Sequence, residues 1–243
     1  MTIEKRALLL FSGGVDSTYQ LYLNIQGKKK TDLLYVDGNQ GKRKMFAEEV
    51  ARTKILRLLD SEYNASSLWC SVSTQSNVNF SESPSVGFAQ APAWFIAALE
   101  AANPERHSEV QICYIAGDQI TGYLDRLIYA WDNLWGIFKQ GEKVPLTFPL
   151  RLKMKTQIYR EIPEDLYHLS WVCELPEYVG DDPHSEGIKY QPCGTCLACT
   201  TRELERRRLK VYGNRELPKD HWTLASERYH DKNLVRPVEK ADA

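Results

Sequence analysis

Short apolar runs alternate with stretches of helical spacing through the first half of the chain. The runs span residues 7–11, 33–36, 68–72 and 110–116. They are short, and three of them are closed by a Gly-containing turn, which is typical of buried parallel strands. Helices are expected over about 15–27, 42–59 and 92–102, because apolar residues recur there at helical spacing. The alternation predicts an α/β fold of Rossmann-like type, with a parallel sheet and helices on both faces.

The pattern changes after about residue 150, where it becomes irregular and charged and where most of the cysteines lie. We therefore expect three parts: an α/β domain over 1–165, a small cysteine-bearing subdomain packed on it over 166–212, and a polar tail over 213–243. The polar stretch 73–85 is expected to be a long loop, and long loops in such folds are often functional.

The composition narrows the function classes. The 243 residues suffice for a sizeable core, and 31 Lys and Arg balance 32 Asp and Glu, so no global field favours a nucleic-acid or membrane partner. No apolar run near the start is long enough for a signal sequence or a membrane span. We expect a cytoplasmic protein, in which clustered cysteines bind a metal more often than they form disulfides.

Ser12-Gly-Gly-Val-Asp-Ser17, here called the phosphate cradle, stands between the first strand and the first helix. Two glycines let the backbone approach a phosphate, and the following helix N-terminus offers free N–H groups. Ser12 and Ser17 add hydroxyl donors, and Asp16 is a candidate ligand for Mg²⁺ on a pyrophosphate. No Lys follows the glycines, so the motif is not a Walker A loop. The alternative is a glycine-rich turn that binds nothing.

Four cysteines form a second motif, here called the cysteine cluster: Cys173, Cys193, Cys196 and Cys199. A CxxCxxC spacing requires a turn wrapped on a metal, and Cys173 supplies a fourth thiolate. Such a closed tetrahedral Zn²⁺ site is structural. A redox CxxC pair and an iron–sulfur cluster remain alternatives, and His184 is a possible substitute for Cys173.

With both motifs, the chain resembles the QueC/ExsB family of 7-cyano-7-deazaguanine synthases, which belongs to the PP-loop ATP pyrophosphatases. The likeness covers most of residues 6–210. It also rests on Gly122-Tyr-Leu-Asp125, on Pro149-Leu150 with Lys155 and Ile158, on Ser170-Trp-Val-Cys173, and on Pro192–Cys199 followed by Arg202.

The resemblance implies an ATP- and zinc-dependent ligase. That family adenylates the carboxylate of 7-carboxy-7-deazaguanine, captures ammonia as the amide, and converts the amide to the nitrile with a second ATP. Lys155 would neutralise phosphate charge beside Asp16, Gln40 would face adenosine, and Tyr123 and Asp125 would bind the guanine-like ring. Three of these residues have an alternative interpretation without a ligand. Lys155 would be a solvated lysine, Gln40 a polar loop residue, and Asp125 an ordinary acid at the start of a helix. A homodimer is also expected.

The chain departs from the family at substrate-side positions. Residues 88–92 replace the family's Arg-Asn pair, and Leu124 and Arg126 replace a Pro and a Cys. One alternative is therefore a diverged enzyme of an antiviral or DNA-modification gene cluster, which stops at the amide or joins the deazaguanine to a protein amine. A PP-loop tRNA-modifying enzyme and a zinc-ribbon module with an inactive nucleotide site are the others.

Two smaller features complete the picture. The segment Arg202–Lys210 mixes basic and acidic residues, which favours a solvated helix face over a docking surface for protein or RNA. Four aromatic residues share one expected helix: Tyr129, Trp131, Trp135 and Phe138. Core or dimer packing explains their spacing better than base stacking.

Overall fold

The computed structural model describes residues 4–37, 42–75, 86–139, 141–181 and 188–212. The chain forms two compact units, 1–205 and 206–243, and the fold and sites below belong to the first. The expected tail 213–243 lies outside the described residues, as do 76–85 of the expected loop. Within the described ranges, none of the helices combines the length and the apolar character that crossing a bilayer requires.

The centre of the first unit is a parallel sheet of five strands in the order β3-β2-β1-β4-β5. The strands are β1 (Arg6–Leu10), β2 (Thr31–Asp37), β3 (Trp69–Gln75), β4 (His107–Gln111) and β5 (Leu146–Thr147). The predicted α/β class with a parallel sheet is confirmed. The strands β2 and β3 lie on one side of β1, and the strands β4 and β5 lie on the other side. The strand order therefore reverses between β1 and β4.

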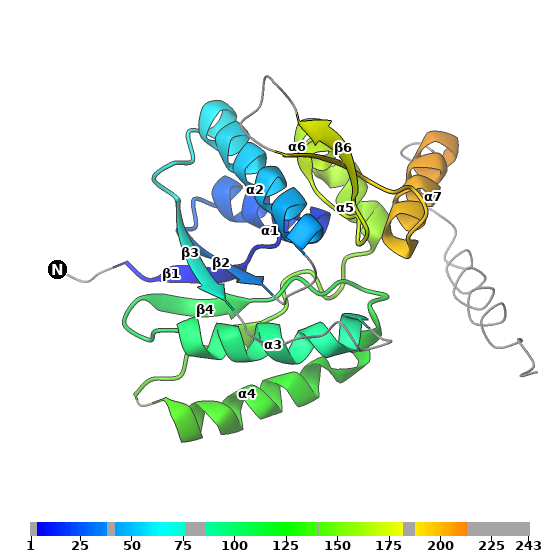
Figure 1. The fold of residues 1–243 in the computed structure, drawn as a ribbon. Coiled ribbons are helices and arrows are strands. Elements are labelled where there is room, and N and C mark those ends of the chain that lie inside the picture. The colour runs from blue at the N-terminus through cyan, green and yellow to red at the C-terminus, as the bar shows by residue number, and fades with distance from the viewer. Residues whose placement is uncertain (1–3, 38–41, 76–85, 140, 182–187, 213–243) are drawn as a thin grey trace, which may run out of the picture. The chain divides into compact units, whose positions relative to one another are not determined.

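Helices cover both faces of the sheet (Figure 1). The helices α1 (Val15–Gln26) and α2 (Lys42–Tyr63) lie over one face, and α3 (Val86–Ala101) and α4 (Leu124–Phe138) lie over the other. The second face carries a continuous apolar core in which Phe95, Trp131 and Trp135 pack against strand residues such as Leu8 and Val110. Trp131 is fully buried, and its indole N–H donates to Val144 O at 2.8 Å.

Asp32 is a fully buried carboxylate near the amino ends of the strands. It accepts hydrogen bonds from Arg6, Arg106 and His107, which join β1, β2 and β4. Burial alone would raise the pKa of Asp32, but its hydrogen bonds from Arg106 and His107 bring the pKa below its ordinary value. Burial also lowers the pKa of His107, although Asp32 opposes that shift.

The described chain after residue 150 forms three helices and a two-stranded hairpin. They are α5 (Lys155–Glu161), α6 (Glu164–Leu169), the antiparallel hairpin of β6 (Glu177–Asp181) and β7 (Ile188–Gln191), and α7 (Leu197–Tyr212). The segment Arg202–Lys210 lies in α7. The side chain of Arg202 donates to Ser170 O and to Tyr167 O, so this basic residue packs inward rather than into solvent.

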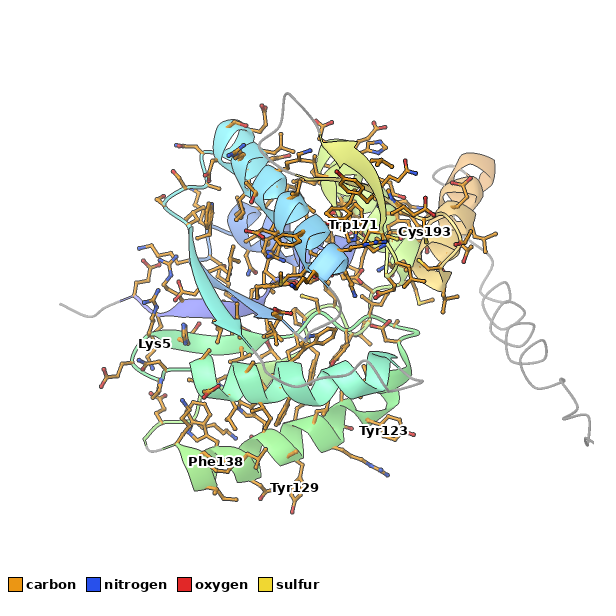
Figure 2. The ribbon with its side chains drawn as sticks, viewed as in Figure 1. Lys5, Tyr123, Tyr129, Phe138, Trp171 and Cys193 are labelled. Carbon is orange, nitrogen blue, oxygen red and sulfur yellow. The ribbon has the colours of Figure 1, made fainter. Side chains whose placement is uncertain are left out.

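Three local predictions were wrong. The fourth strand is His107–Gln111 rather than 110–116, because its apolar run continues into the loop that follows the strand. The helix α3 begins at Val86, so Pro92 lies inside it rather than near its start. Residues 73–75, expected to begin a long loop, belong to β3. Of the four aromatic residues of α4, Trp131 and Trp135 are buried, which confirms core packing for them, whereas Tyr129 and Phe138 are 72% and 68% exposed and point outward (Figure 2).

Candidate functional site

The phosphate cradle forms the turn between β1 and α1. Gly13 adopts a φ of +79°, a left-handed conformation that a residue with a Cβ adopts only at a cost. Ser12 Oγ accepts the Gly14 N–H at 3.2 Å and lies 3.3 Å from Ser17 Oγ. Ser17 Oγ also lies 3.2 Å from Gly14 O, to which it donates. The serines therefore fix the turn that places the N-terminus of α1 at the end of β1.

Neighbouring residues leave little room for a side chain at either glycine of the cradle. A Cβ on Gly13 would lie 2.8 Å from Arg52 Cγ, and one on Gly14 would lie 3.2 Å from Ser12 Oγ and 3.5 Å from Trp171 O. Neighbouring segments therefore hold the cradle on two sides. Such a fixed turn of backbone N–H groups at a helix N-terminus suits a phosphate.

Lys155 and Asp16 meet in the folded chain, although 139 residues separate them in the sequence. Lys155 Nζ lies 2.7 and 2.6 Å from the two carboxylate oxygens of Asp16. Both side chains are about one-quarter exposed, at 26% and 25%, so solvent and ligands reach the pair. Lys155 is the first residue of α5. The two candidate catalytic residues thus form one ion pair beside the phosphate cradle.

Asp118 is a third charged residue of this site, which sequence reasoning missed. Its carboxylate accepts the Ile115 N–H at 2.9 Å. Burial raises the pKa of Asp118, the charge of Asp16 raises it further, and Lys155 lowers it, which places all three groups within electrostatic reach. A signal was present in the sequence, because the pair Gly117-Asp118 follows the fourth apolar run as Ser12-Gly13 follows the first.

The topology explains why these residues meet. In open parallel sheets, ligands bind at the carboxyl ends of the strands where the strand order reverses. Here the reversal lies between β1 and β4. The phosphate cradle follows β1, Asp118 follows β4, and Lys155 follows β5. The candidate active site therefore lies where the sheet itself predicts a ligand site.

The two predicted substrate-binding residues, Tyr123 and Asp125, follow β4 in the 3₁₀ helix η1 (Gln119–Tyr123) and in α4. Tyr123 ends η1 and is 44% exposed. Arg126 lies over its ring at 5.4 Å. Asp125 is exposed in the first turn of α4. Gln40 lies outside the described residues.

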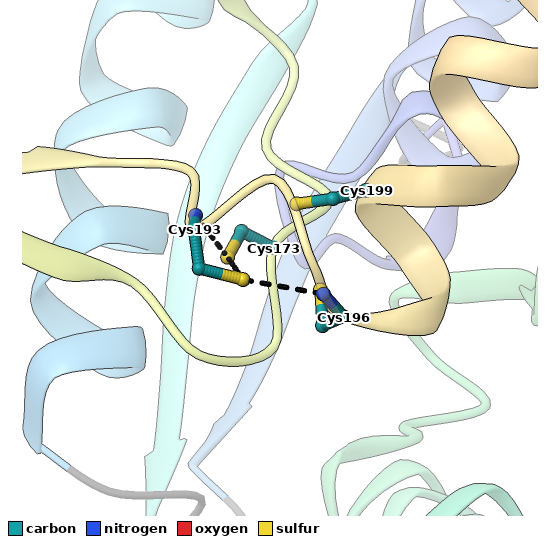
Figure 3. A group of neighbouring side chains, drawn as sticks. All are labelled: Cys173, Cys193, Cys196 and Cys199. Carbon is teal, nitrogen blue, oxygen red and sulfur yellow. Dashed lines mark hydrogen bonds between the residues drawn. The ribbon is translucent and has the colours of Figure 1, made fainter.

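The four sulfurs of the cysteine cluster converge (Figure 3). Their Sγ atoms all lie within 4.8 Å of one another, and Cys173 Sγ is 3.6 Å from Cys193 Sγ. A tetrahedral site with Zn–S bonds of about 2.3 Å requires sulfur separations of about 3.8 Å. The cluster therefore fits a metal such as zinc. His184, the possible substitute ligand, lies outside the described residues.

The surroundings of the cysteines also favour a metal site. Cys173 and Cys199 are buried, whereas Cys193 and Cys196 are partly exposed. Hydrogen bonds from Thr195 and from the Cys196 N–H lower the pKa of Cys193 to about 6, so its thiolate forms near neutral pH. Burial raises the pKa of Cys173 and of Cys199. A bound cation would offset the cost of those buried thiolates.

Comparison with known proteins finds likeness only among solved structures. No protein-family profile matches the chain, and no curated protein matches it. Among solved structures, the chain is similar to the structure of NMN synthetase from Francisella tularensis, with 14% identity and a TM-score of 0.32, over 97% of this chain and 90% of that one. The site is therefore assigned from the geometry of this chain's own residues.

Proposed function

We propose that the chain is a QueC-like ATP-dependent ligase, which adenylates the carboxylate of 7-carboxy-7-deazaguanine and transfers the acyl group to a nitrogen nucleophile. The Asp16–Lys155 ion pair beside the phosphate cradle carries the proposal. It supports ATP chemistry because Lys155 adds a positive charge, and Asp16 a carboxylate that can bind a metal ion, to a turn already suited to phosphate. The sequence resemblance supplies the substrate class.

The proposed first step is attack by a substrate carboxylate oxygen on the α-phosphorus of ATP. The bond from the α-phosphorus to the bridging α,β oxygen breaks, and pyrophosphate leaves with the electron pair. The backbone N–H groups of the cradle and the hydroxyls of Ser12 and Ser17 would hold the pyrophosphate. Lys155 would leave Asp16 and follow the charge that develops on the leaving phosphates.

In the second step, the nitrogen nucleophile attacks the acyl carbon and AMP leaves. A deprotonated donor is required, because the lone pair forms the new carbon–nitrogen bond while a proton is lost. Asp118, which follows β4 at the same edge of the sheet as the cradle and whose pKa is raised by burial, is the residue proposed to take up this proton. Ammonia gives the amide, and a second ATP would then convert the amide to the nitrile.

Two metal ions belong to the proposal. Asp16 would hold Mg²⁺ on the phosphates, and this requires its two oxygens to exchange Lys155 for the ion. Mg²⁺ supplies charge neutralisation when it is bound. Zn²⁺ in the cysteine cluster would be structural, because four thiolates leave no open position.

The proposed substrate contacts are Asp125, whose carboxylate would accept from the N1–H and amino group of the ring, and Tyr123 beside it. Gln40 would face adenosine. A small deazaguanine acid is the expected partner, either alone or with a protein amine as acceptor, and a homodimer is the expected assembly.

The test is a product analysis by mass. The zinc-loaded protein is incubated with 7-carboxy-7-deazaguanine, Mg²⁺-ATP and ammonia, and the proposal predicts AMP, pyrophosphate and the amide or nitrile. Lys155→Met should slow AMP formation by about 100-fold or more, the usual cost of losing one charge-stabilising group. Lys153→Met is the matched control, because Lys153 pairs with Glu161 instead and should leave the rate within about threefold.

The products also separate the alternatives. Nitrile from ammonia supports the family reaction, and amide alone supports an enzyme that stops earlier. A mass increment on a candidate protein acceptor supports conjugation to a protein amine. AMP that appears only when tRNA is added would replace the proposal with a tRNA-modifying activity, and absence of AMP from every mixture would remove adenylation altogether.

A further inference from the structure

The segment Ser170–Glu174 contains Cys173 of the cysteine cluster and contacts the phosphate cradle. The Trp171 N–H donates to Gly13 O at 2.9 Å. The Trp171 carbonyl oxygen lies 3.5 Å from the position that a Cβ on Gly14 would occupy. Trp171 therefore bonds to Gly13 through its N–H, and its C=O limits the space beside Gly14.

The same residue is tied to the cysteine cluster. The indole N–H of Trp171 donates to Cys173 O at 2.9 Å, and Figure 2 shows Trp171 and Cys193 in the same part of the molecule. Cys173 is fully buried, and its Sγ accepts the Cys193 N–H at 3.3 Å. A single residue, Val172, separates the candidate metal ligand Cys173 from the residue that contacts Gly13.

A second route connects the same two places. Glu174, next to Cys173, forms an ion pair with the buried Lys44 of α2, which lies 3.7 Å from Glu48. The Glu48 carbonyl oxygen lies 3.4 Å from the Cβ position of Gly13. The cradle is thus held between α2 and the Ser170–Glu174 segment, and Glu174 joins these two supports.

We propose that Trp171 is a positioning residue, which couples metal binding at the cysteine cluster to nucleotide binding at the phosphate cradle. This inference rests on the proposed ATP-binding function. With metal bound, Cys173 is fixed and Trp171 holds Gly13 in its left-handed conformation before the nucleotide arrives. Without metal, nucleotide binding must also order the Ser170–Glu174 segment, so its affinity is lower. Linkage requires the nucleotide to raise metal affinity by the same factor.

The test measures this coupling in both directions. Calorimetry with α,β-methylene-ATP in excess Mg²⁺ gives the nucleotide affinity of the full-length zinc-loaded and zinc-free protein, with circular dichroism to confirm folding. Competition with a chelator gives the zinc affinity with and without the analogue. We expect removal of zinc to weaken nucleotide binding by about tenfold, and the analogue to strengthen zinc binding by about tenfold.

Two matched variants locate the coupling. Trp171→Phe keeps the backbone N–H but removes the indole donor to Cys173 O, and it should reduce the coupling factor by roughly fivefold, the usual worth of one hydrogen bond. Trp69→Phe removes an equivalent indole donor, at 2.8 Å from Asp60 Oδ1, and should leave the factor unchanged. If the zinc-free protein unfolds, the comparison is made in the zinc-loaded state, where Trp171→Phe alone should weaken nucleotide binding.

Each result is decisive. Equal nucleotide affinity with and without zinc, together with zinc affinity indifferent to the analogue, overturns the coupling. Equal coupling in Trp171→Phe and wild type overturns the role of Trp171. If no form of the protein binds the analogue, the proposed function fails and this inference fails with it. A zinc ion that only stabilises the fold would leave the nucleotide affinity of the folded protein unchanged when it is removed.

Discussion

Replacing Gly13 with Ala tests the geometry of the phosphate cradle. The φ of +79° at Gly13 favours glycine, and a new Cβ would lie 2.8 Å from Arg52 Cγ and 3.4 Å from the Glu48 carbonyl oxygen. The substitution therefore combines an unfavourable backbone conformation with a steric clash. It also disturbs the carbonyl that accepts the Trp171 N–H.

The magnitude follows from those two terms. A residue with a Cβ in the left-handed region costs about 1–2 kcal/mol. Moving the Arg52 stem out of contact adds about 1 kcal/mol, at the low end for overpacking. We expect Gly13→Ala to lower the free energy of unfolding by about 2–3 kcal/mol and to weaken ATP binding as well.

Urea unfolding of the zinc-loaded protein, followed by circular dichroism, measures this change. Gly136→Ala is the matched control, since Gly136 lies in α4 with no heavy atom within 4 Å of its Cβ position. There the new methyl group should be neutral or stabilise by about 0.5 kcal/mol. A Gly13→Ala protein as stable as wild type, with ATP affinity unchanged, would refute the account of the cradle.

Three further predictions concern the metal site, pH and the core. Cys199→Ser should abolish stoichiometric zinc after dialysis, measured by elemental analysis, whereas Cys113→Ser should retain it because Cys113 lies outside the cluster. Because the pKa of His107 is lowered in the folded protein, the unfolded chain binds more protons than the folded one. The free energy of unfolding should therefore fall as the pH drops below 6.5, the ordinary pKa of histidine. His107→Gln should flatten that slope in urea titrations, and an unchanged slope would exclude His107 as its source. Trp131→Ala should cost about 3–5 kcal/mol in the same assay, and the exposed Tyr129→Ala less than about 0.5 kcal/mol.

The sequence predicted the elements around the cradle better than it predicted contacts between distant segments. The apolar run before Ser12 and the periodicity after Gly14 correctly predicted β1 and α1, because both are local patterns. The spacing of the cysteines likewise predicted that their sulfurs converge. Within α4, spacing alone did not separate buried Trp131 from exposed Tyr129, since that depends on which face meets α3 and the sheet.

Long-range features of the site were beyond local pattern. Lys155 meets Asp16 only because the strand order brings the segment after β5 beside the cradle, and no periodicity encodes that order. Asp118 was missed although Gly117-Asp118 follows an apolar run, because its proximity to Asp16 and Lys155 depends on the same strand order. The contact between Trp171 and Gly13 depends on how the cysteine-bearing segment folds back on the first turn of the sheet.

The most direct test of adenylation is exchange of labelled pyrophosphate into ATP. The zinc-loaded protein is incubated with ATP, Mg²⁺, labelled pyrophosphate and 7-carboxy-7-deazaguanine, without any nitrogen donor. The account predicts label in ATP that depends on the acid and is strongly reduced in Asp16→Asn. No exchange with the acid present, or release of ADP and phosphate in place of AMP and pyrophosphate, would contradict it.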